Sequence, residues 1–139
     1  MRFLIVDDSI AMRRILTTTL KRQGYEDVVE AANGLEALDC LTASPVDAII
    51  TDWIMPEMDG IEFVRAVRAR EDGQQVPLLM MTTHATREHI IEAMNAGVTG
   101  YILKPFTPDT LQEKIDALVL AKQKDKDAPK ADQEEATNP

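Results

Sequence analysis

Val46-Asp47-Ala48-Ile49-Ile50-Thr51-Asp52, near the middle of a chain of 139 residues, is an almost continuous apolar run that ends on an acidic side chain. Such a run is typical of a central strand in a parallel sheet, because that strand is covered on both faces. A second run, Leu78-Leu79-Met80-Met81, has the same character and is followed by Thr82. The two runs predict the middle of a parallel sheet with polar side chains at its carboxyl edge.

Outward from this centre, apolar segments alternate with stretches of helical period. We expect strands at residues 2–6, 28–31, 46–51, 77–82 and 99–103. In the other stretches, apolar residues recur at spacings of three and four, as on one face of a helix. These residues are Met12, Ile15, Leu16 and Leu20; Leu35, Leu38 and Leu41; Ile61, Val64 and Val67; Ile90, Ile91 and Met94; and Leu111, Ile115, Leu118 and Val119. The alternation implies right-handed crossovers and a doubly wound α/β fold with helices on both faces of the sheet.

Residues suited to helix ends stand at several of the expected boundaries. Ser9 can cap the first helix, and Gly97 can end the fourth. Thr107 followed by Pro108 is the clearest start, since threonine favours the capping position and proline the first helical position.

Composition restricts the functions open to the chain. The formal net charge of −9 argues against direct nucleic-acid binding, which depends on Lys and Arg at phosphates. No apolar run approaches the roughly 18 residues that a membrane span needs, and the N-terminal apolar segment runs straight into acidic residues, unlike a signal peptide. Cys40 is the single cysteine, so a disulfide within the chain is excluded. We expect a cytoplasmic protein without membrane insertion.

The helical pattern ends near Lys122. Residues 123–139 contain no large apolar side chain and are rich in charge. We therefore expect one domain over residues 1–122, and an acidic tail over residues 123–139 that is disordered or a frayed helical extension.

Polar residues gather at the expected carboxyl ends of the strands, where doubly wound folds bind their ligands. They are Asp7, Asp8, Asp52, Thr82 and Lys104. Like charges in one place repel, and a hard divalent cation resolves that conflict. We expect Mg2+, with Mn2+ as a substitute, held by Asp7, Asp8 and Asp52, and by a backbone carbonyl just after Asp52, at Ile54.

A carboxylate beside a metal ion, a lysine and a hydroxyl is suited to phosphoryl transfer. Asp52 would be the nucleophile that forms an aspartyl phosphate, and Lys104 and Thr82 would contact phosphoryl oxygens. A single Asp after a strand is usually a turn or cap residue, but the shared position of the cluster favours a site. His84 and His89 are five residues apart, which is a poor spacing for a histidine metal site on one helical face.

At these residues the chain closely resembles response-regulator receiver domains. The resemblance is carried by Asp7-Asp8, by Asp52-Trp53-Ile54-Met55-Pro56-Glu57-Met58-Asp59-Gly60, by Thr82 and by Gly100-Tyr101-Ile102-Leu103-Lys104-Pro105-Phe106. It implies a flavodoxin-like sheet of five parallel strands in the order 2-1-3-4-5, flanked by five helices. Trp53, Tyr101 and an expected lack of an output domain make the chain most similar to stand-alone chemotaxis regulators of the CheY type.

The resemblance also implies a function. Asp52 would accept a phosphoryl group from a chemotaxis-type histidine kinase, and the protein would be a regulator that assists its own phosphorylation and dephosphorylation rather than an enzyme. Thr82 and Tyr101 would act as switch residues that remodel the face formed by the fourth helix, last strand and fifth helix. The partner on that face would be the flagellar motor switch or another effector, with a phosphatase as a further partner. The bond between Lys104 and Pro105 is expected to be cis.

Four positions depart from the best-known chemotaxis member. Ile54 replaces a polar residue and His84 an acidic one, so we expect both to tune the rate of dephosphorylation. Thr86-Arg87 stands where that member has two lysines on its partner-binding face, which bears on motor binding.

Other functions stay open at this point. An aspartyl-phosphate phosphatase commonly has a second acid two residues after its nucleophile, where this chain has Ile54. A flavodoxin-like cofactor binder would need a phosphate-cradling loop after the first strand, where Asp7 and Asp8 would repel phosphate. A phosphate sink, or a single-domain regulator of another pathway, remains the alternative within signalling.

Overall fold

The computed structural model describes residues 1–83 and 86–127, and it contains one parallel sheet in the order β2-β1-β3-β4-β5. The strands are β1 (Arg2–Val6), β2 (Asp27–Ala31), β3 (Ala48–Asp52), β4 (Leu78–Thr82) and β5 (Gly100–Leu103). The helices are α1 (Ile10–Arg22), α2 (Gly34–Ala43), α3 (Gly60–Ala69), α4 (Arg87–Ala96) and α5 (Pro108–Asp127), with a short 3-10 helix η1 (Glu71–Gly73) after α3. This architecture confirms the expected doubly wound fold, its strand order and its five flanking helices.

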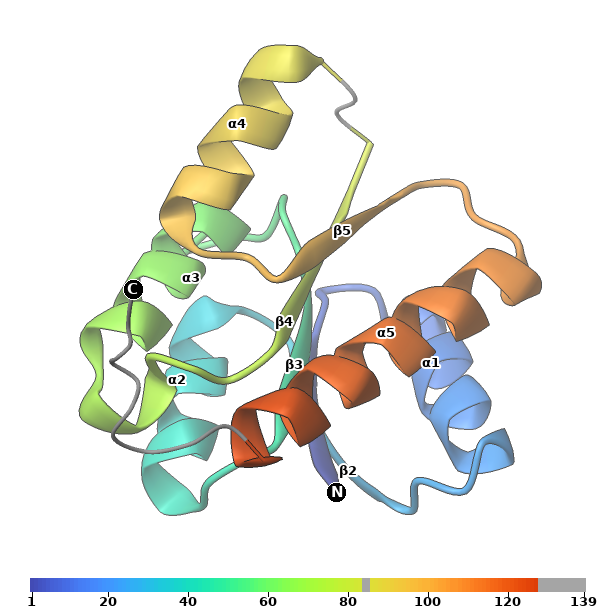
Figure 1. Cartoon of the computed structure of the whole chain (residues 1–139). Coiled ribbons are helices and arrows are strands. Elements are labelled where there is room, and N and C mark those ends of the chain that lie inside the picture. The colour runs from blue at the N-terminus through green and yellow to red at the C-terminus, as the bar shows by residue number, and fades with distance from the viewer. Residues whose placement is uncertain (84–85, 128–139) are drawn as a thin grey trace, which may run out of the picture.

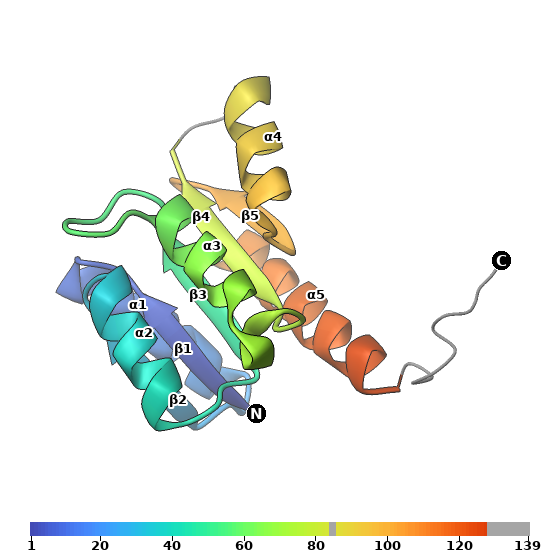
Figure 2. The same cartoon turned by 90° about the vertical axis from the view of Figure 1, so that its left-hand side faces the viewer.

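The helices cover the two faces of the sheet in separate groups (Figures 1 and 2). On one face, α1 and α5 pack on the sheet through Leu16, Leu20 and Ile115. On the other face, α2 and α3 contribute Leu41 and Phe63 to a second cluster. Because both faces are covered, β3 and β4 are buried along their whole length, which explains their almost uninterrupted apolar sequences.

The expected caps are present. The Ser9 hydroxyl accepts the Met12 N–H at 3.2 Å, and Gly97 ends α4 in the left-handed conformation, with φ of 113°. The Thr107 hydroxyl accepts the Thr110 N–H at 3.1 Å at the start of α5. These local hydrogen bonds fix where the loops at the carboxyl edge join their helices.

The third strand begins later than expected, at Ala48 rather than Val46. Asp47 explains the difference, because its carboxylate accepts the Arg2 N–H at 2.7 Å while its own N–H donates to the Arg2 carbonyl at 2.8 Å. Asp47 thus closes the amino end of the sheet instead of continuing the apolar run.

Several of the apolar residues that marked the expected helices are exposed. Ile15 and Leu35 are among them, and on α4 the side chains of Ile91 and Met94 are 47% and 49% exposed. The small side chains Ala93 and Ala96 occupy the sheet-facing side of α4 instead. The expected helix is present, but its buried side is formed by alanines and not by the large apolar residues that marked it.

The final helix runs to Asp127, five residues beyond the predicted domain boundary at Lys122. The Lys122 ammonium lies 3.7 Å from Asp47, so this part of α5 contacts the amino edge of the sheet. The predicted tail from residue 128 onward lies outside the described residues. Within the described part of the chain, the search for long apolar helices found no candidate membrane span.

Gly60, the first residue of α3, lies where the chain turns back on the end of β3. Its N–H donates to the Trp53 carbonyl at 2.7 Å. A Cβ at this position would lie 2.7 Å from the Trp53 Cα and would also overlap the Asp52 carbonyl oxygen. Both neighbours are backbone atoms, so the helix can begin here only with glycine.

We expect Gly60→Ala to lower the free energy of unfolding by about 2–3 kcal/mol, because backbone must move to admit the methyl group. Urea unfolding measures the change. Gly100→Ala is the matched control, since a Cβ there would meet its nearest neighbour, Leu79 Cδ1, at 3.9 Å. Equal stability of Gly60→Ala and wild type would contradict the close approach.

Candidate functional site

The pairing of β1 and β3 places the first two acidic groups at one level. Val6 pairs with Thr51, so Asp7 and Asp52 follow side by side at the carboxyl ends of adjacent strands. Asp8, one residue further, is exposed. Asp7, Asp8 and Asp52 each offer a carboxylate oxygen within 4.8 Å of the others. The fold therefore brings together the three predicted metal ligands.

The same edge of the sheet positions Thr82 and Lys104. Thr82 pairs with Leu103 in the β4–β5 ladder, and the Lys104 N–H donates to the Thr82 carbonyl at 2.8 Å. Thr82 is buried, with 3% of its surface exposed. The peptide bond between Lys104 and Pro105 is cis, as the resemblance implied.

Lys104 links two of the carboxylates. Its ammonium lies 3.2 Å from Asp52 Oδ2 and 3.5 Å from Asp7 Oδ2. Asp7 is 1% exposed and Asp52 8% exposed, so these ion pairs are shielded from water. One cation shared by two buried carboxylates leaves the cluster short of positive charge.

The excess of negative charge affects the pKa of the Asp7 carboxyl. Burial raises the pKa of the Asp7 carboxyl, and the charges of Asp52 and Asp8 raise it further. The Ser9 N–H, which donates to Asp7 Oδ1 at 2.8 Å, and the Lys104 ammonium act in the opposite direction. Asp7 Oδ2 is buried without a hydrogen-bond donor. A divalent cation fits this donor set, because it would supply charge to an oxygen that hydrogen bonding leaves unsatisfied.

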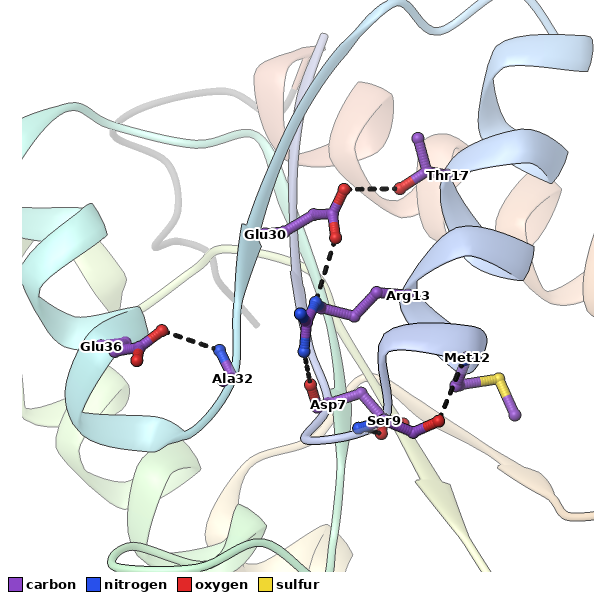
Figure 3. Close-up of polar contacts among 8 residues, drawn as sticks. All are labelled: Asp7, Ser9, Met12, Arg13, Thr17, Glu30, Ala32 and Glu36. Carbon is purple, nitrogen blue, oxygen red and sulfur yellow. Dashed lines mark hydrogen bonds and ion pairs between the residues drawn. The ribbon is translucent and has the colours of Figure 1, made fainter.

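The loop between β1 and α1 is held in place by Arg13 (Figure 3). The Arg13 Nη1 donates to the Asp7 carbonyl at 2.6 Å, and its Nε donates to Glu30 Oε1 at 3.0 Å. The Thr17 hydroxyl donates to the second Glu30 oxygen at 3.4 Å. Arg13 thus ties the backbone of Asp7 to both α1 and β2, which fixes the start of the acidic loop.

The Asp52 carboxylate is oriented by its own neighbour. The Trp53 N–H donates to Asp52 Oδ1 at 2.8 Å and also lies 3.0 Å from the Met81 carbonyl. On the other side, Gly60 donates to the Trp53 carbonyl. With Trp53 fixed from both directions, the Asp52 oxygens have a defined orientation toward Lys104.

The remaining predicted residues that the structure describes include Ile54, Tyr101 and Thr86. The side chain of Ile54 is 60% exposed, and His84 lies outside the described residues. Tyr101, on β5, is partly buried, and the Lys114 ammonium is 5.6 Å from its ring centroid. Thr86 caps α4 through its hydroxyl, which accepts the His89 N–H at 3.3 Å.

Three supporting residues had been given no structural role from the sequence: Arg13, Asp59 and Gly60. Asp59 and Glu62 form a capping box at α3, with distances of 2.8 and 3.0 Å. The pair Asp59 and Glu62, three residues apart before an apolar run, was a readable signal for that cap. Arg13 had no such signal, since its role depends on a contact with Glu30 that only the folded chain brings close.

Comparison with known proteins agrees with this geometry. The family described as the response regulator receiver domain matches residues 3–116. A chemotaxis protein CheY homolog of Campylobacter jejuni is 50% identical over 117 residues, covering 84% of this chain and 90% of that protein. CheY1 of Helicobacter pylori strain J99 is 48% identical over 120 residues, covering 86% of this chain and 97% of that protein.

Solved structures show the same likeness. The chemotaxis response regulator CheY4 of Vibrio cholerae has a TM-score of 0.80 and 41% identity, covering 84% of this chain and 97% of that one. The receiver domain of the sensor histidine kinase PA1611 of Pseudomonas aeruginosa, described with a magnesium ion coordinated in its active-site cleft, has a TM-score of 0.76 and 29% identity, covering 85% of this chain and 96% of that one. On these matches and the acidic site at the carboxyl edge, this chain belongs to the response-regulator receiver domain family and is a two-component response regulator.

Proposed function

We propose that this protein is a chemotaxis response regulator that accepts a phosphoryl group from a histidine kinase on Asp52. The observation that carries the proposal is the Lys104 ammonium, which lies between Asp52 and Asp7 at 3.2 and 3.5 Å beside the exposed Asp8. The chemotaxis role is supported by CheY proteins of three genera that are 48–50% identical to this chain.

Mg2+ is the proposed cofactor, with Mn2+ as a substitute. Asp7, Asp8 and Asp52 would hold it, and the Ile54 carbonyl would add a fourth oxygen. The magnesium described in the related PA1611 domain and the close carboxylates of this chain both support the assignment. When bound, Mg2+ neutralises charge on the carboxylates and on phosphoryl oxygens.

Asp52 suits the role of nucleophile better than its neighbours. Asp7 is 1% exposed and so is closed to a phosphodonor, whereas Asp52 is 8% exposed and, unlike Asp8, contacts the Lys104 ammonium. An oxygen of the Asp52 carboxylate would form a bond to phosphorus as the bond from phosphorus to the donor histidine nitrogen breaks. The electron pair of that bond stays with the imidazole, and the product is an aspartyl phosphate.

Lys104 and Thr82 would stabilise the transferred group. The ammonium that offsets two carboxylates is positioned to move toward phosphoryl oxygens once they arrive, and the Thr82 hydroxyl at the next strand end would donate to another oxygen. Water later attacks phosphorus, which releases inorganic phosphate and regenerates the carboxylate. Ile54 and His84 would set how readily that water enters, and a phosphatase partner would assist it.

Receiver domains are regulators rather than enzymes, so the output is a binding surface. Exposed apolar side chains on the surface formed by α4, β5 and α5, among them Ile91, Met94 and Leu103, support this surface as the contact for an effector such as the flagellar motor switch. Thr82 and Tyr101 would couple this surface to the phosphorylation site at Asp52. The cytoplasmic location stays a prediction that suits this pairing with a histidine kinase.

Asp52→Asn should abolish phosphorylation by acetyl phosphate in Mg2+, because the amide is no nucleophile. Intact mass measures the added phosphoryl group, and the emission of Trp53, the single tryptophan, reports it in solution. We expect wild-type emission to fall with Mg2+ and to change again with acetyl phosphate, and the second change to vanish in the variant. Asp39→Asn, on the exposed side of α2, should behave as wild type. A phosphorylated Asp52→Asn protein would refute the assignment.

Mg2+ should raise the melting temperature of wild type, since it binds the folded acidic site. At ten times the dissociation constant the gain is about 1.4 kcal/mol, or roughly 4–6 °C. Asp8→Asn removes an exposed ligand without opening the core and should lose most of this gain, whereas Asp109→Asn at the start of α5 should keep it. Scanning calorimetry with and without Mg2+ measures the shift, and an undiminished gain in Asp8→Asn would count against the metal site.

Lys104→Met should slow phosphorylation by acetyl phosphate about 10–100-fold, because it removes the cation that offsets phosphoryl charge. Lys21→Met makes the same chemical change on the exposed side of α1 and should have no such effect. Rates from quenched-flow mass analysis provide the comparison. Wild-type kinetics in Lys104→Met would show that the ammonium does not act on the phosphoryl group.

A further inference from the structure

His89, on the first turn of α4, contacts the residue that follows the phosphoacceptor. The rings of Trp53 and His89 have centroids 5.5 Å apart and planes at 80°, in an edge-to-face arrangement. Contacts of this geometry between aromatic rings are favourable beyond simple burial. The contact therefore joins the loop after β3 directly to α4.

The His89 ring is also tied to the start of its own helix. His89 Nδ1 lies 2.5 Å from the Thr86 hydroxyl oxygen, and the same oxygen accepts the His89 backbone N–H at 3.3 Å. Thr86 is the N-cap of α4. A hydroxyl that accepts the backbone N–H can donate its own hydrogen to Nδ1, so the ring and the cap hold each other in place.

At its other end the contact reaches the reacting carboxylate. The Trp53 N–H donates to Asp52 Oδ1 at 2.8 Å, so a change in charge or position of that oxygen acts on Trp53 directly. A series of contacts thus runs from Asp52 through Trp53 and His89 to Thr86, using hydrogen bonds at both ends and a ring contact between them.

The anchoring of α4 makes this contact important. The buried residues of α4 are Ala93 and Ala96, while Ile91 and Met94 are about half exposed. Two alanine side chains bury little apolar surface, so the ring contact adds to a small apolar anchor at the N-terminal end of the helix. At the C-terminal end, the Arg68 guanidinium donates to the Gly97 carbonyl at 2.8 and 2.9 Å. Such weakly anchored elements are the ones that move at low energetic cost.

There is also space for the rings to rearrange. A pocket of about 280 Å³ opens between the loop after β3 and α4, and Trp53, Ile54, Met55, Asp59, His89 and Glu92 line it. Trp53 is 8% exposed and packs in the core, and this pocket leaves space for its indole to shift on the side of His89. We propose that His89 is a positioning residue that couples the state of Asp52 to the N-terminus of α4 through its ring contact with Trp53. This inference rests on the proposed phosphorylation of Asp52.

Amide resonances of α4, followed in 15N spectra as beryllofluoride is added with Mg2+ to mimic the phosphoryl group, test the proposal. In His89→Ala, beryllofluoride should still bind, but the shift changes at residues 87–96 should fall to less than half of those in wild type. His89→Phe keeps an aromatic ring without the bond to Thr86 and should retain most of the response. Asn95→Ala removes an exposed side chain of the same helix and should respond as wild type.

The outcomes separate the two proposals. A full α4 response in His89→Ala would overturn the role of His89 while leaving the phosphoacceptor intact. Equal losses in His89→Phe and His89→Ala would overturn the ring contact as the carrier of the coupling. A wild-type protein that failed to bind beryllofluoride, or an Asp52→Asn protein that bound it, would overturn the proposed function and the role of His89 with it.

Discussion

The Lys104 ammonium offsets the charges of two buried carboxylates, Asp52 at 3.2 Å and Asp7 at 3.5 Å, and the rest of the site depends on that interaction. Without a cation between them, two like charges in shielded positions would repel strongly. With one cation between two anions, the cluster still carries an excess of negative charge. The fold thus tolerates a local electrostatic repulsion that a bound divalent cation would relieve.

The fold holds the acidic residues in place against this repulsion with rigid support. Arg13 holds the Asp7 carbonyl, and the close approach of Gly60 fixes Trp53, whose N–H orients Asp52. Both supports act on backbone carbonyls, those of Asp7 and Trp53, so neither of these hydrogen bonds uses a carboxylate oxygen. Such support favours the proposed attack by Asp52, because an oxygen that is already oriented loses less freedom when the phosphodonor binds.

How much of this structure the sequence predicts depends on how far apart in the chain the interacting residues lie. The strands and the meeting of Asp7, Asp52 and Lys104 follow from apolar runs and from the rule that strand ends of a parallel sheet share one edge. The strand order came from the family resemblance, because local patterns do not determine which strands pair. Arg13 could not be predicted, since its partner Glu30 is distant in sequence.

The sequence could not predict which face of α4 is exposed, for a different reason. Ile90 and Ile91 are adjacent and so point to different sides of a helix, and the pattern does not decide which side packs on the sheet. Small residues decided it: Ala93 and Ala96 permit a close approach that larger side chains would block. Hydrophobic periodicity gives most weight to large side chains, and it therefore fails where a helix packs through its smallest ones.

The contrast between a rigid site and a loosely held helix explains how one phosphoryl group could alter a surface. A two-state element responds to a ligand only by the difference in free energy that the ligand supplies, and coupling between sites in proteins is typically about 1–3 kcal/mol. An element anchored by large buried side chains would need more than this to move. Because the buried side chains of α4 are two alanines and its ring contact is with Trp53 alone, we expect a change of that size at Asp52 to shift the balance between positions of this helix. On the proposed function, the weak packing of α4 serves signalling, whereas the firm support of Asp7 and Asp52 serves the chemistry.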